Sequence, residues 1–371
     1  MPSSAVSFTE LEGVGDADLY PCDADHMAAL LYTGGTTGAS KGVMLSHNNL
    51  RWMAEASVVA SEVTEDEMSA MVLPLSHGFG LGVAVIGSLI KGRGAMLRWF
   101  DPAQTCDLIE RFPINRMTAV PTMLQMMLAT PLEERDLSSL EVVVSGAAPL
   151  PGEVQSAFER RVPSCRILQG YGLSETSPTI SVQRLSDAIK GRTKPGSVGR
   201  PLPGLDVHIV SGETGEPLAP GDVGEIAVRG PNVMLGYWRN EDASAQSIRD
   251  GYFFTGDMGK LDADGNLWIG DRRKDLIIRG GMNVFPVDVE ASLLECPGVL
   301  EAAVVGRSSE KYGEEPVAFV VLVASASADE VNVHSQVNLA KYKRPVEIRP
   351  VDAIPKTPVG KIDKKELRAQ L

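Results

Sequence analysis

The 371-residue sequence has few cysteines, no long apolar run and no excess of basic charge. Its four cysteines, Cys22, Cys106, Cys165 and Cys296, are scattered, with no C-x-x-C pair and no zinc-ligand spacing. This pattern excludes a disulfide framework and predicts reduced thiols in a cytoplasmic protein. The longest apolar stretch, near residues 80–90, is too short to span a bilayer. The first residues have neither the basic nor the apolar region of a signal peptide.

The shortage of positive charge also bears on partners. The formal net charge is −13 and the isoelectric point is near 5.0, which argues against non-specific binding of nucleic acid through a basic surface. Any polyanion must therefore be met by locally placed cations. A chain of 371 residues is long enough for two or three domains with sizeable cores.

Glycine and hydroxyl residues are concentrated at residues 30–42, LLYTGGTTGASKG, directly behind a short apolar run. Small residues let backbone N–H groups converge on one point, and a lysine adds positive charge, so the stretch is a candidate phosphate cradle. It differs from the common P-loop, which needs Ser or Thr after the lysine, because Gly42 follows here. A flexible surface loop is the alternative interpretation. The candidate phosphate-binding residues are Thr33, Gly34, Gly35, Thr36, Thr37, Gly38 and Lys41.

The first half of the chain alternates short buried strands with amphipathic helices. This alternation predicts an α/β fold with a doubly wound, mostly parallel sheet. Ligands of such sheets bind beyond the carboxyl ends of the strands. The expected strands cover residues 27–32, 68–74, 95–99, 116–120 and 141–145, and the expected helices cover 46–62, 80–91 (buried) and 102–111.

The pattern changes near residue 196 to short strands separated by turns, which predicts an antiparallel or barrel-like subdomain. The charged residues 272–275, RRKD, suggest a domain boundary, followed by a small α+β domain. Residues 324–333 carry few turn or helix signals. We therefore expect a leader (1–26), an ATP- and acyl-binding α/β subdomain (27–195), a β-rich subdomain (196–273) and a C-terminal α+β domain (274–371).

Four further blocks follow the glycine-rich stretch: YGLSET at 171–176, GYFFTGD at 251–257, GDRRKD at 270–275 and PKTPVGK at 355–361. Together, in this order, the five blocks resemble those of the acyl-adenylate-forming superfamily, which includes acyl-CoA synthetases, peptide-synthetase adenylation domains and luciferases. The resemblance implies a mobile C-terminal domain and the use of ATP, Mg²⁺ and coenzyme A. Relatives usually have Ser at the position of Gly34 and Thr at that of Ser174.

The resemblance also implies an unusual N-terminus. Superfamily members ordinarily carry a large lobe before the phosphate loop, whereas 26 residues precede the first expected strand here. We therefore expect the doubly wound sheet to be incomplete at its N-terminus. A partner polypeptide, or self-association, is expected to replace the lobe.

On the nucleotide side, the resemblance implies that Glu175 is the Mg²⁺ ligand and that Ser174 contacts the α-phosphate. Tyr171 is expected to stack on adenine, beside Gly146 and Ala147. The resemblance further implies that Asp257 binds the ribose hydroxyls, since two acceptor oxygens suit a vicinal diol. Standing alone, each of these residues has an ordinary alternative: a helix-dipole partner for Glu175, a core residue for Tyr171 and a turn residue for Asp257.

Other roles concern the two halves of the reaction. Arg272 resembles the arginine that reaches the ribose or phosphate, and Lys274 occupies the position of the hinge between domains. Lys361 resembles the catalytic lysine that bridges the carboxylate and the α-phosphate in one domain orientation; a solvated tail lysine is the alternative. Gly280 and Gly281 are expected to let the pantetheine arm of CoA pass in the other orientation.

The acyl pocket is expected near His77, Gly78 and Gly170. His77 resembles a gate residue, with a core or capping histidine as the alternative. No acidic residue lies between positions 74 and 90, and Gly170 stands where malonate-type enzymes are expected to carry arginine. Both features favour an apolar or aryl acid, with a fatty acid preferred.

The expected activity is that of an ATP-dependent acid–thiol ligase. It forms acyl-AMP with release of pyrophosphate and then transfers the acyl group to CoA. The alternatives are an adenylating ligase that serves a carrier protein, an aryl-acid CoA ligase, and a non-catalytic nucleotide-binding remnant.

Overall fold

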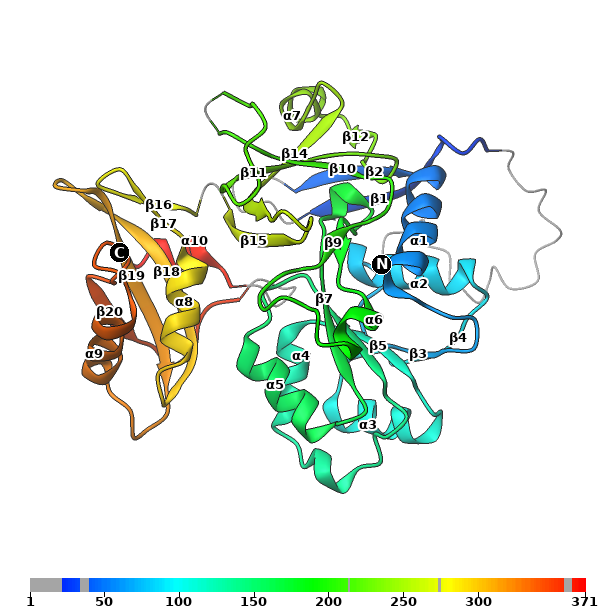
Figure 1. The fold of residues 1–371 in the computed structure, drawn as a ribbon, viewed down its shortest axis with the longest axis horizontal. Coiled ribbons are helices and arrows are strands. Elements are labelled where there is room, and N and C mark those ends of the chain that lie inside the picture. The colour runs from blue at the N-terminus through cyan, green and yellow to red at the C-terminus, as the bar shows by residue number, and fades with distance from the viewer. Residues whose placement is uncertain (1–21, 34–39, 213, 273–274, 357–361) are drawn as a thin grey trace, which may run out of the picture.

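The computed structural model describes residues 22–33, 40–212, 214–272, 275–356 and 362–371. They form a larger body with three sheets and a smaller body beside it, drawn in yellow to red in Figure 1. This is the mixed α/β fold that the sequence predicts.

The sheet that organises the larger body has seven strands in the order β4-β3-β5-β6-β7-β8-β9, and the first five run parallel. The strands are β3 (Met68–Met71), β4 (Arg93–Met96), β5 (Arg116–Ala119), β6 (Val142–Ser145), β7 (Arg166–Tyr171), β8 (Ser181–Val182) and β9 (Arg200–Pro201). The parallel sheet predicted from the alternating pattern is therefore confirmed.

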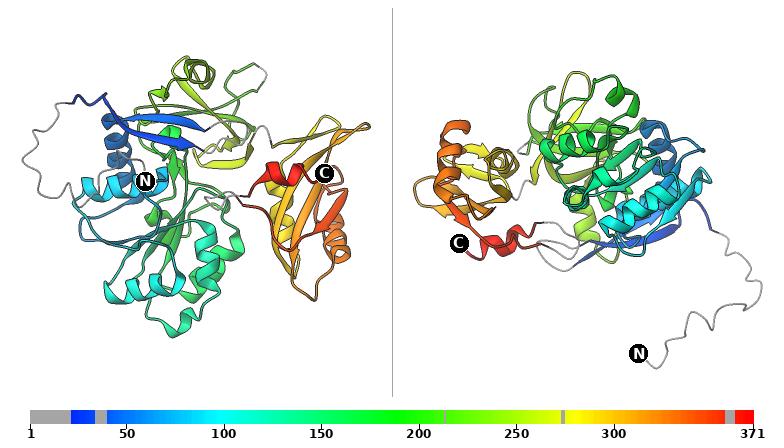
Figure 2. Two further views of the ribbon diagram at one scale, coloured as in Figure 1. Left: turned by 180° about the vertical axis from the view of Figure 1, so that it is seen from behind. Right: turned by 90° about the horizontal axis from the view of Figure 1, so that it is seen from below.

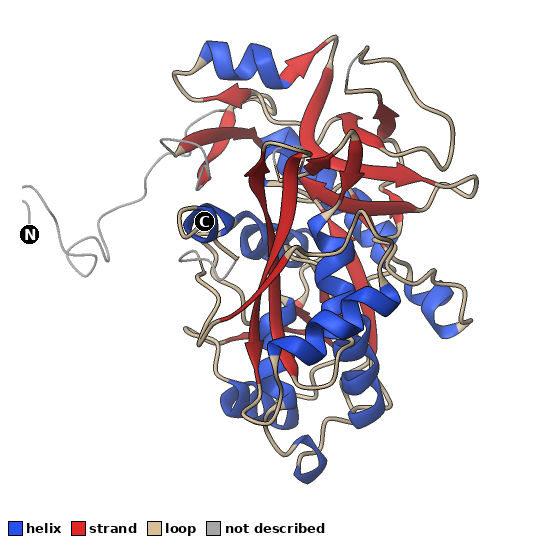
Figure 3. Ribbon diagram, turned by 90° about the vertical axis from the view of Figure 1, so that its left-hand side faces the viewer, coloured by secondary structure: helices blue, strands red, loops and turns tan. Residues whose placement is uncertain are grey.

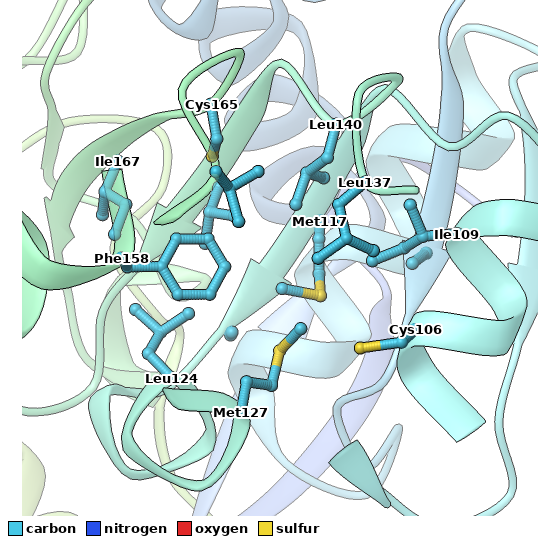
Figure 4. Packing of buried hydrophobic residues seen from close by; sticks show 14 of the residues in the cluster. Cys106, Ile109, Met117, Leu124, Met127, Leu137, Leu140, Phe158, Cys165 and Ile167 are labelled. Atoms are coloured by element: carbon cyan, nitrogen blue, oxygen red, sulfur yellow. The ribbon is translucent and has the colours of Figure 1, made fainter. Parts of the chain in front are cut away.

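Helices cover both faces of this sheet. The helices are α1 (His47–Ser61), α2 (Gly78–Leu89), α3 (Pro102–Arg111), α4 (Pro121–Leu128), α5 (Gly152–Arg161) and the short α6 (Leu185–Ile189). One face packs against α3, α4 and α5, with Phe158, Met117 and Leu124 at the centre of the core (Figure 4). The other face packs against α1 through Ala56 and Ala60. Ser46 begins α1 with a reciprocal side-chain cap, shared with Asn49.

Helix α2 departs from the prediction of a buried helix. Its buried residues are Gly78, Gly80 and Gly82, while Leu89 is 40% exposed. The glycines explain the difference, because a Cβ at Gly80 would lie 2.2 Å from the carbonyl oxygen of Pro74. A narrow glycine stripe packs on the body, and most of the apolar side chains of the helix remain partly exposed.

A second sheet frames the glycine-rich stretch. It contains β1 (Met27–Thr33), β2 (Lys41–Ser46) and β12 (Gly236–Tyr237), all antiparallel, with Thr33 opposite Lys41. The first strand therefore lies outside the parallel sheet. Strand β2 is not predicted from the sequence, because it starts inside the glycine-rich stretch and runs directly into α1.

The third sheet is antiparallel, as predicted, and lies above the parallel sheet in Figure 1. Its strands are β10 (Asp206–Val210), β11 (Gly224–Arg229), β13 (Ile248–Arg249), β14 (Tyr252–Leu261) and β15 (Leu267–Arg272), with α7 (Glu241–Ser247) before β13. Ile209, Ile226 and Leu267 form its buried cluster.

The smaller body is an α+β unit whose long strands β18 and β19 pair over their whole length (Figures 2 and 3). Its elements are β16 (Ile277–Arg279), β17 (Met282–Val284), α8 (Pro286–Leu294), β18 (Val299–Ser309), β19 (Gly313–Leu322), α9 (Ala328–Asn338), β20 (Glu347–Pro350) and α10 (Lys364–Arg368). Helix α9 contradicts the weak helix signal expected for residues 324–333. Ser327 and Glu330 form a capping box that starts the helix, and this local S-x-x-E pattern explains why the helix forms.

The cysteines fit the prediction of structural thiols. All four are free, and Cys106, Cys165 and Cys296 are buried. Burial raises the pKa of Cys165 to about 12, so its unreactive thiol form dominates at neutral pH. None of the described helices has the length and apolar character needed to cross a membrane.

Candidate active site

An open cleft lies at the carboxyl ends of the parallel strands and extends toward the smaller body. Its volume of about 3380 Å³ is several times that of a typical small-ligand pocket, so it has room for several ligand groups at once. Asp275, Glu290 and Leu294 line it from the smaller body. The predicted site residues that line the cleft are Thr33, Lys41, His77, Gly78, Gly146, Ala147, Gly170, Tyr171, Ser174, Glu175 and Asp257.

Tyr171 and Asp257 meet in this cleft from different sheets. The Tyr171 hydroxyl donates to Oδ2 of Asp257 at 2.6 Å, and Asp257 is only 6% exposed. A bulge in β14 positions the carboxylate: the Asp257 N–H donates to Oγ1 of Thr255 at 3.1 Å, and the Gly256 N–H donates to Oε1 of Glu225 at 3.0 Å. Gly256 has a φ of +73°, which favours glycine. The carboxylate is therefore held beside an aromatic ring, as a nucleoside site needs.

The carboxylate of Glu175 is held near the glycine-rich stretch. Ser174 and Glu175 lie in a 3₁₀ turn, Ser174–Thr176, directly after β7 and Gly172. Asn232 secures this segment by donating its amide to the carbonyl oxygens of Thr176 and Thr179, at 3.1 Å and 2.8 Å. Oε1 of Glu175 accepts a hydrogen bond from the hydroxyl of Tyr237 at 3.0 Å.

Thr33 and Lys41 flank the glycine-rich stretch on facing strands. Oγ1 of Thr33 donates to the carbonyl oxygen of Lys41 at 3.4 Å, and Nζ of Lys41 lies 4.7 Å from the centre of the Tyr237 ring. The remaining predicted residues of this stretch, Gly34, Gly35, Thr36, Thr37 and Gly38, lie outside the described residues. The strands nevertheless deliver both ends of the stretch to the cleft.

His77 begins α2, where its Nδ1 accepts the Phe79 N–H at 3.2 Å. The capping interpretation of His77 is therefore confirmed, and its ring also lines the cleft. The small residues nearby serve close packing. A Cβ on Gly78 would lie 3.3 Å from Oγ of Ser174, and one on Gly146 would lie 3.0 Å from the carbonyl oxygen of Gly170.

Two of the remaining predicted residues lie away from the cleft lining. Gly280 and Gly281 form the two-residue turn between β16 and β17, with φ values of +58° and +80°, and they are not among the lining residues. Arg272 ends β15, where its backbone lies opposite Asp257. Lys274 and Lys361 lie outside the described residues.

The fold and the cleft are those of the acyl-adenylate-forming superfamily, and the comparisons agree. The model of the AMP-binding enzyme family matches residues 3–238, and that of the AMP-binding enzyme C-terminal domain matches residues 288–361. The chain belongs to this family.

Three similar proteins illustrate the range of the family. A long-chain-fatty-acid–CoA ligase of Bacillus subtilis (strain 168) is 40% identical over 358 residues, 93% of this chain and 62% of the ligase. A feruloyl-CoA synthase of an Amycolatopsis species is 38% identical over 352 residues, 94% of this chain and 70% of the synthase. The solved O-succinylbenzoate coenzyme A synthetase of Bacillus subtilis, in complex with ATP and magnesium ion, superimposes with a TM-score of 0.84 and 33% identity. That superposition covers 94% of this chain and 70% of the synthetase. The chain thus spans between 62% and 70% of the length of these three relatives.

Proposed function

We propose that the chain carries the active site of an AMP-forming acid–thiol ligase. The observation that carries this proposal is the convergence of three groups on one cleft: the Tyr171–Asp257 pair, the Glu175 carboxylate and the Lys41 ammonium. They suit, respectively, a nucleoside, a divalent cation and a phosphate chain. The names of the relatives, which are CoA ligases and synthetases, support this assignment.

The donor set fits a Mg²⁺ ion that arrives with ATP. No group of three or more His, Cys, Asp or Glu side chains suited to a metal occurs among the described residues. Glu175 lines the cleft together with Lys41, on the side assigned to the phosphates. Mg²⁺ is commonly held by one or two carboxylates together with substrate phosphates, so one Glu is sufficient. When bound, the ion supplies positive charge to the phosphate oxygens.

The reaction then has two steps. A carboxylate oxygen of the acid bonds to the α-phosphorus of ATP, the bond to the β-phosphate oxygen breaks, and pyrophosphate leaves. The sulfur of CoA next bonds to the acyl carbon, the bond from that carbon to the phosphate oxygen of AMP breaks, and AMP and the thiol proton are released. The first step brings two anions together, so cations and N–H donors matter more than a strong base. We assign Lys41 and the flanking loop to the phosphates, Asp257 to the ribose, Ser174 to the α-phosphate and Lys361 to the carboxylate.

A fatty acid is the preferred substrate. Phe79, Val83 and Ile86 of α2 line the cleft beside His77, and the sequence of α2 contains no charged residue. An apolar lining selects an uncharged acyl group because burying an unpaired charge is costly. An aryl acid is the second candidate, favoured by the similarity to a feruloyl-CoA synthase.

A substrate screen tests this proposal. We expect ATP–pyrophosphate exchange with medium- and long-chain fatty acids, and weaker exchange with ferulate and succinylbenzoate. Stronger exchange with ferulate would move the assignment to the aryl-acid class. Exchange without CoA-dependent thioester formation would favour delivery to a carrier protein. Absence of exchange with every acid would identify a nucleotide-binding remnant and contradict the proposed function.

We also propose that an apolar face at the edge of the larger body is covered by another polypeptide or by a second copy of this chain. The face comprises α2, the edge strand β4 and the segment that follows it. Leu89 is 40%, Met96 54% and Trp99 75% exposed. Apolar side chains grouped beside an unpaired strand edge are typical of interaction surfaces.

This face makes a prediction for the isolated chain. It is expected to bind an apolar fluorescent dye strongly and to self-associate, as measured by dye titration and by sedimentation velocity. The double variant Met96→Lys, Trp99→Lys should lower both signals. A monodisperse monomer that binds little dye and melts cooperatively would contradict the proposed interface.

A further inference from the structure

Tyr237 connects two groups of the cleft that are far apart in sequence. Its hydroxyl donates to Oε1 of Glu175 at 3.0 Å, and its ring lies 4.7 Å from Nζ of Lys41. The residue is 7% exposed and lines the cleft with both neighbours. One buried side chain therefore contacts both the candidate metal ligand, Glu175, and the lysine of the candidate phosphate loop, Lys41.

The backbone around Tyr237 repeats this connection. Strand β12 pairs with β2, with Tyr237 opposite Val43, and the Trp238 N–H donates to the carbonyl oxygen of Gly42 at 2.7 Å. On the other side, the Met234 N–H donates to the carbonyl oxygen of Glu175 at 2.9 Å. Residues 234–238 are thus bonded both to the strand that leaves the glycine-rich stretch and to the turn that carries Glu175.

We propose that Tyr237 is a positioning residue that orients the Glu175 carboxylate relative to Lys41. This inference rests on the proposed function, which assigns Glu175 to Mg²⁺ and Lys41 to the phosphates. A free glutamate side chain samples several rotamers, and ordering it opposes ligand binding. The hydroxyl of Tyr237 restrains Oε1 and leaves Oε2 for a cation. Both groups are then directed at the same phosphate chain before ATP binds.

The aromatic ring has a separate, structural role. It packs in a buried cluster with Val43, Met234 and Phe253. Phenylalanine at position 237 keeps this packing and the ring beside Lys41, and removes only the hydroxyl. The variant Tyr237→Phe therefore separates positioning of the carboxylate from stability of the fold.

The experiment measures divalent-ion binding directly, with Mn²⁺ as a paramagnetic probe in the presence of ATP, on the full chain. Tyr237→Phe is expected to weaken Mn²⁺ binding about tenfold, the low end of the loss of one hydrogen bond to a charged group. Its melting temperature without ligands should match that of the wild type. The adenylation rate should require correspondingly more Mg²⁺, with KM for the acid unchanged.

A matched control is available. The hydroxyl of Tyr252 also donates to a carboxylate, that of Asp206, but Tyr252 does not line the cleft. Tyr252→Phe should leave Mn²⁺ binding unchanged. A double-mutant cycle tests whether Tyr237 acts through Glu175. In a Glu175→Gln background, Tyr237→Phe should have no further effect on Mn²⁺ binding.

Two results would overturn the positioning role alone. One is wild-type Mn²⁺ affinity in Tyr237→Phe, and the other is an equal loss of affinity with Glu175→Gln already present. A wild-type chain that neither binds Mn²⁺ with ATP nor catalyses pyrophosphate exchange would instead contradict the proposed function, and the positioning role with it.

Discussion

Replacing Lys361 by alanine is expected to abolish acyl-adenylate formation while leaving attack of CoA on supplied acyl-AMP largely intact. Loss of one transition-state cation should slow the first step by about 10²–10³-fold, by analogy with an oxyanion-stabilising donor. Lys361 itself lies outside the described residues, but both ends of its segment lie at the cleft. Lys356 and Ile362 form a bridge there, and both line the cleft.

The two half-reactions should be measured separately, by pyrophosphate exchange and by thioester formation from synthetic acyl-AMP. Lys341→Ala serves as a control, since Lys341 is exposed on the smaller body and is not among the residues that line the cleft. Equal damage to both steps would contradict a role for Lys361 in only one domain orientation.

Asp257→Ala is expected to weaken ATP binding by roughly 1.5–3 kcal/mol, the range for hydrogen bonds to a charged group. The physical reason is loss of the acceptor for both ribose hydroxyls. The nucleotide 2′-deoxy-ATP should bind the wild type more weakly than ATP does, and its affinity should fall less than that of ATP when Asp257 is replaced. Calorimetric titration of both nucleotides measures this.

The half-buried Asp206 lies on the same sheet and pairs with Arg229 outside the cleft. Asp206→Ala should therefore leave nucleotide affinity unchanged. Unaltered ATP affinity in Asp257→Ala would return Asp257 to the role of a turn residue, with Tyr171 as its structural partner.

Local sequence signals predict the parallel sheet well because each buried strand is a short apolar run followed by a turn. Strands β5 and β6 agree with prediction to within a residue at each end. The predicted nucleotide residues Tyr171, Glu175 and Asp257 also lie in one cleft, because each ends, follows or interrupts a strand of the larger body.

Sequence reasoning fails where a role depends on distant partners. Strand β12 is two residues long, too short to show a periodicity of its own. It forms because it pairs with Val43 and Met44 of β2. Tyr237 consequently resembles an ordinary core aromatic. Glu225 and Asn232 are missed for the same reason, since their partners Gly256 and Thr176 lie 31 and 56 residues away.

The pairing of β2 with β12 also has a consequence for how the chain is made. Asn49, which caps the start of α1 beside β2, donates its amide to the carbonyl oxygen of Pro231, 182 residues later. Synthesis proceeds at about 5–20 residues per second, so roughly 10–40 s pass between synthesis of the β1–β2 pair and synthesis of its partners near residue 231. During that interval its backbone edge is open to wrong pairing. We therefore expect slower translation between residues 46 and 237 to lower the yield of correctly folded protein.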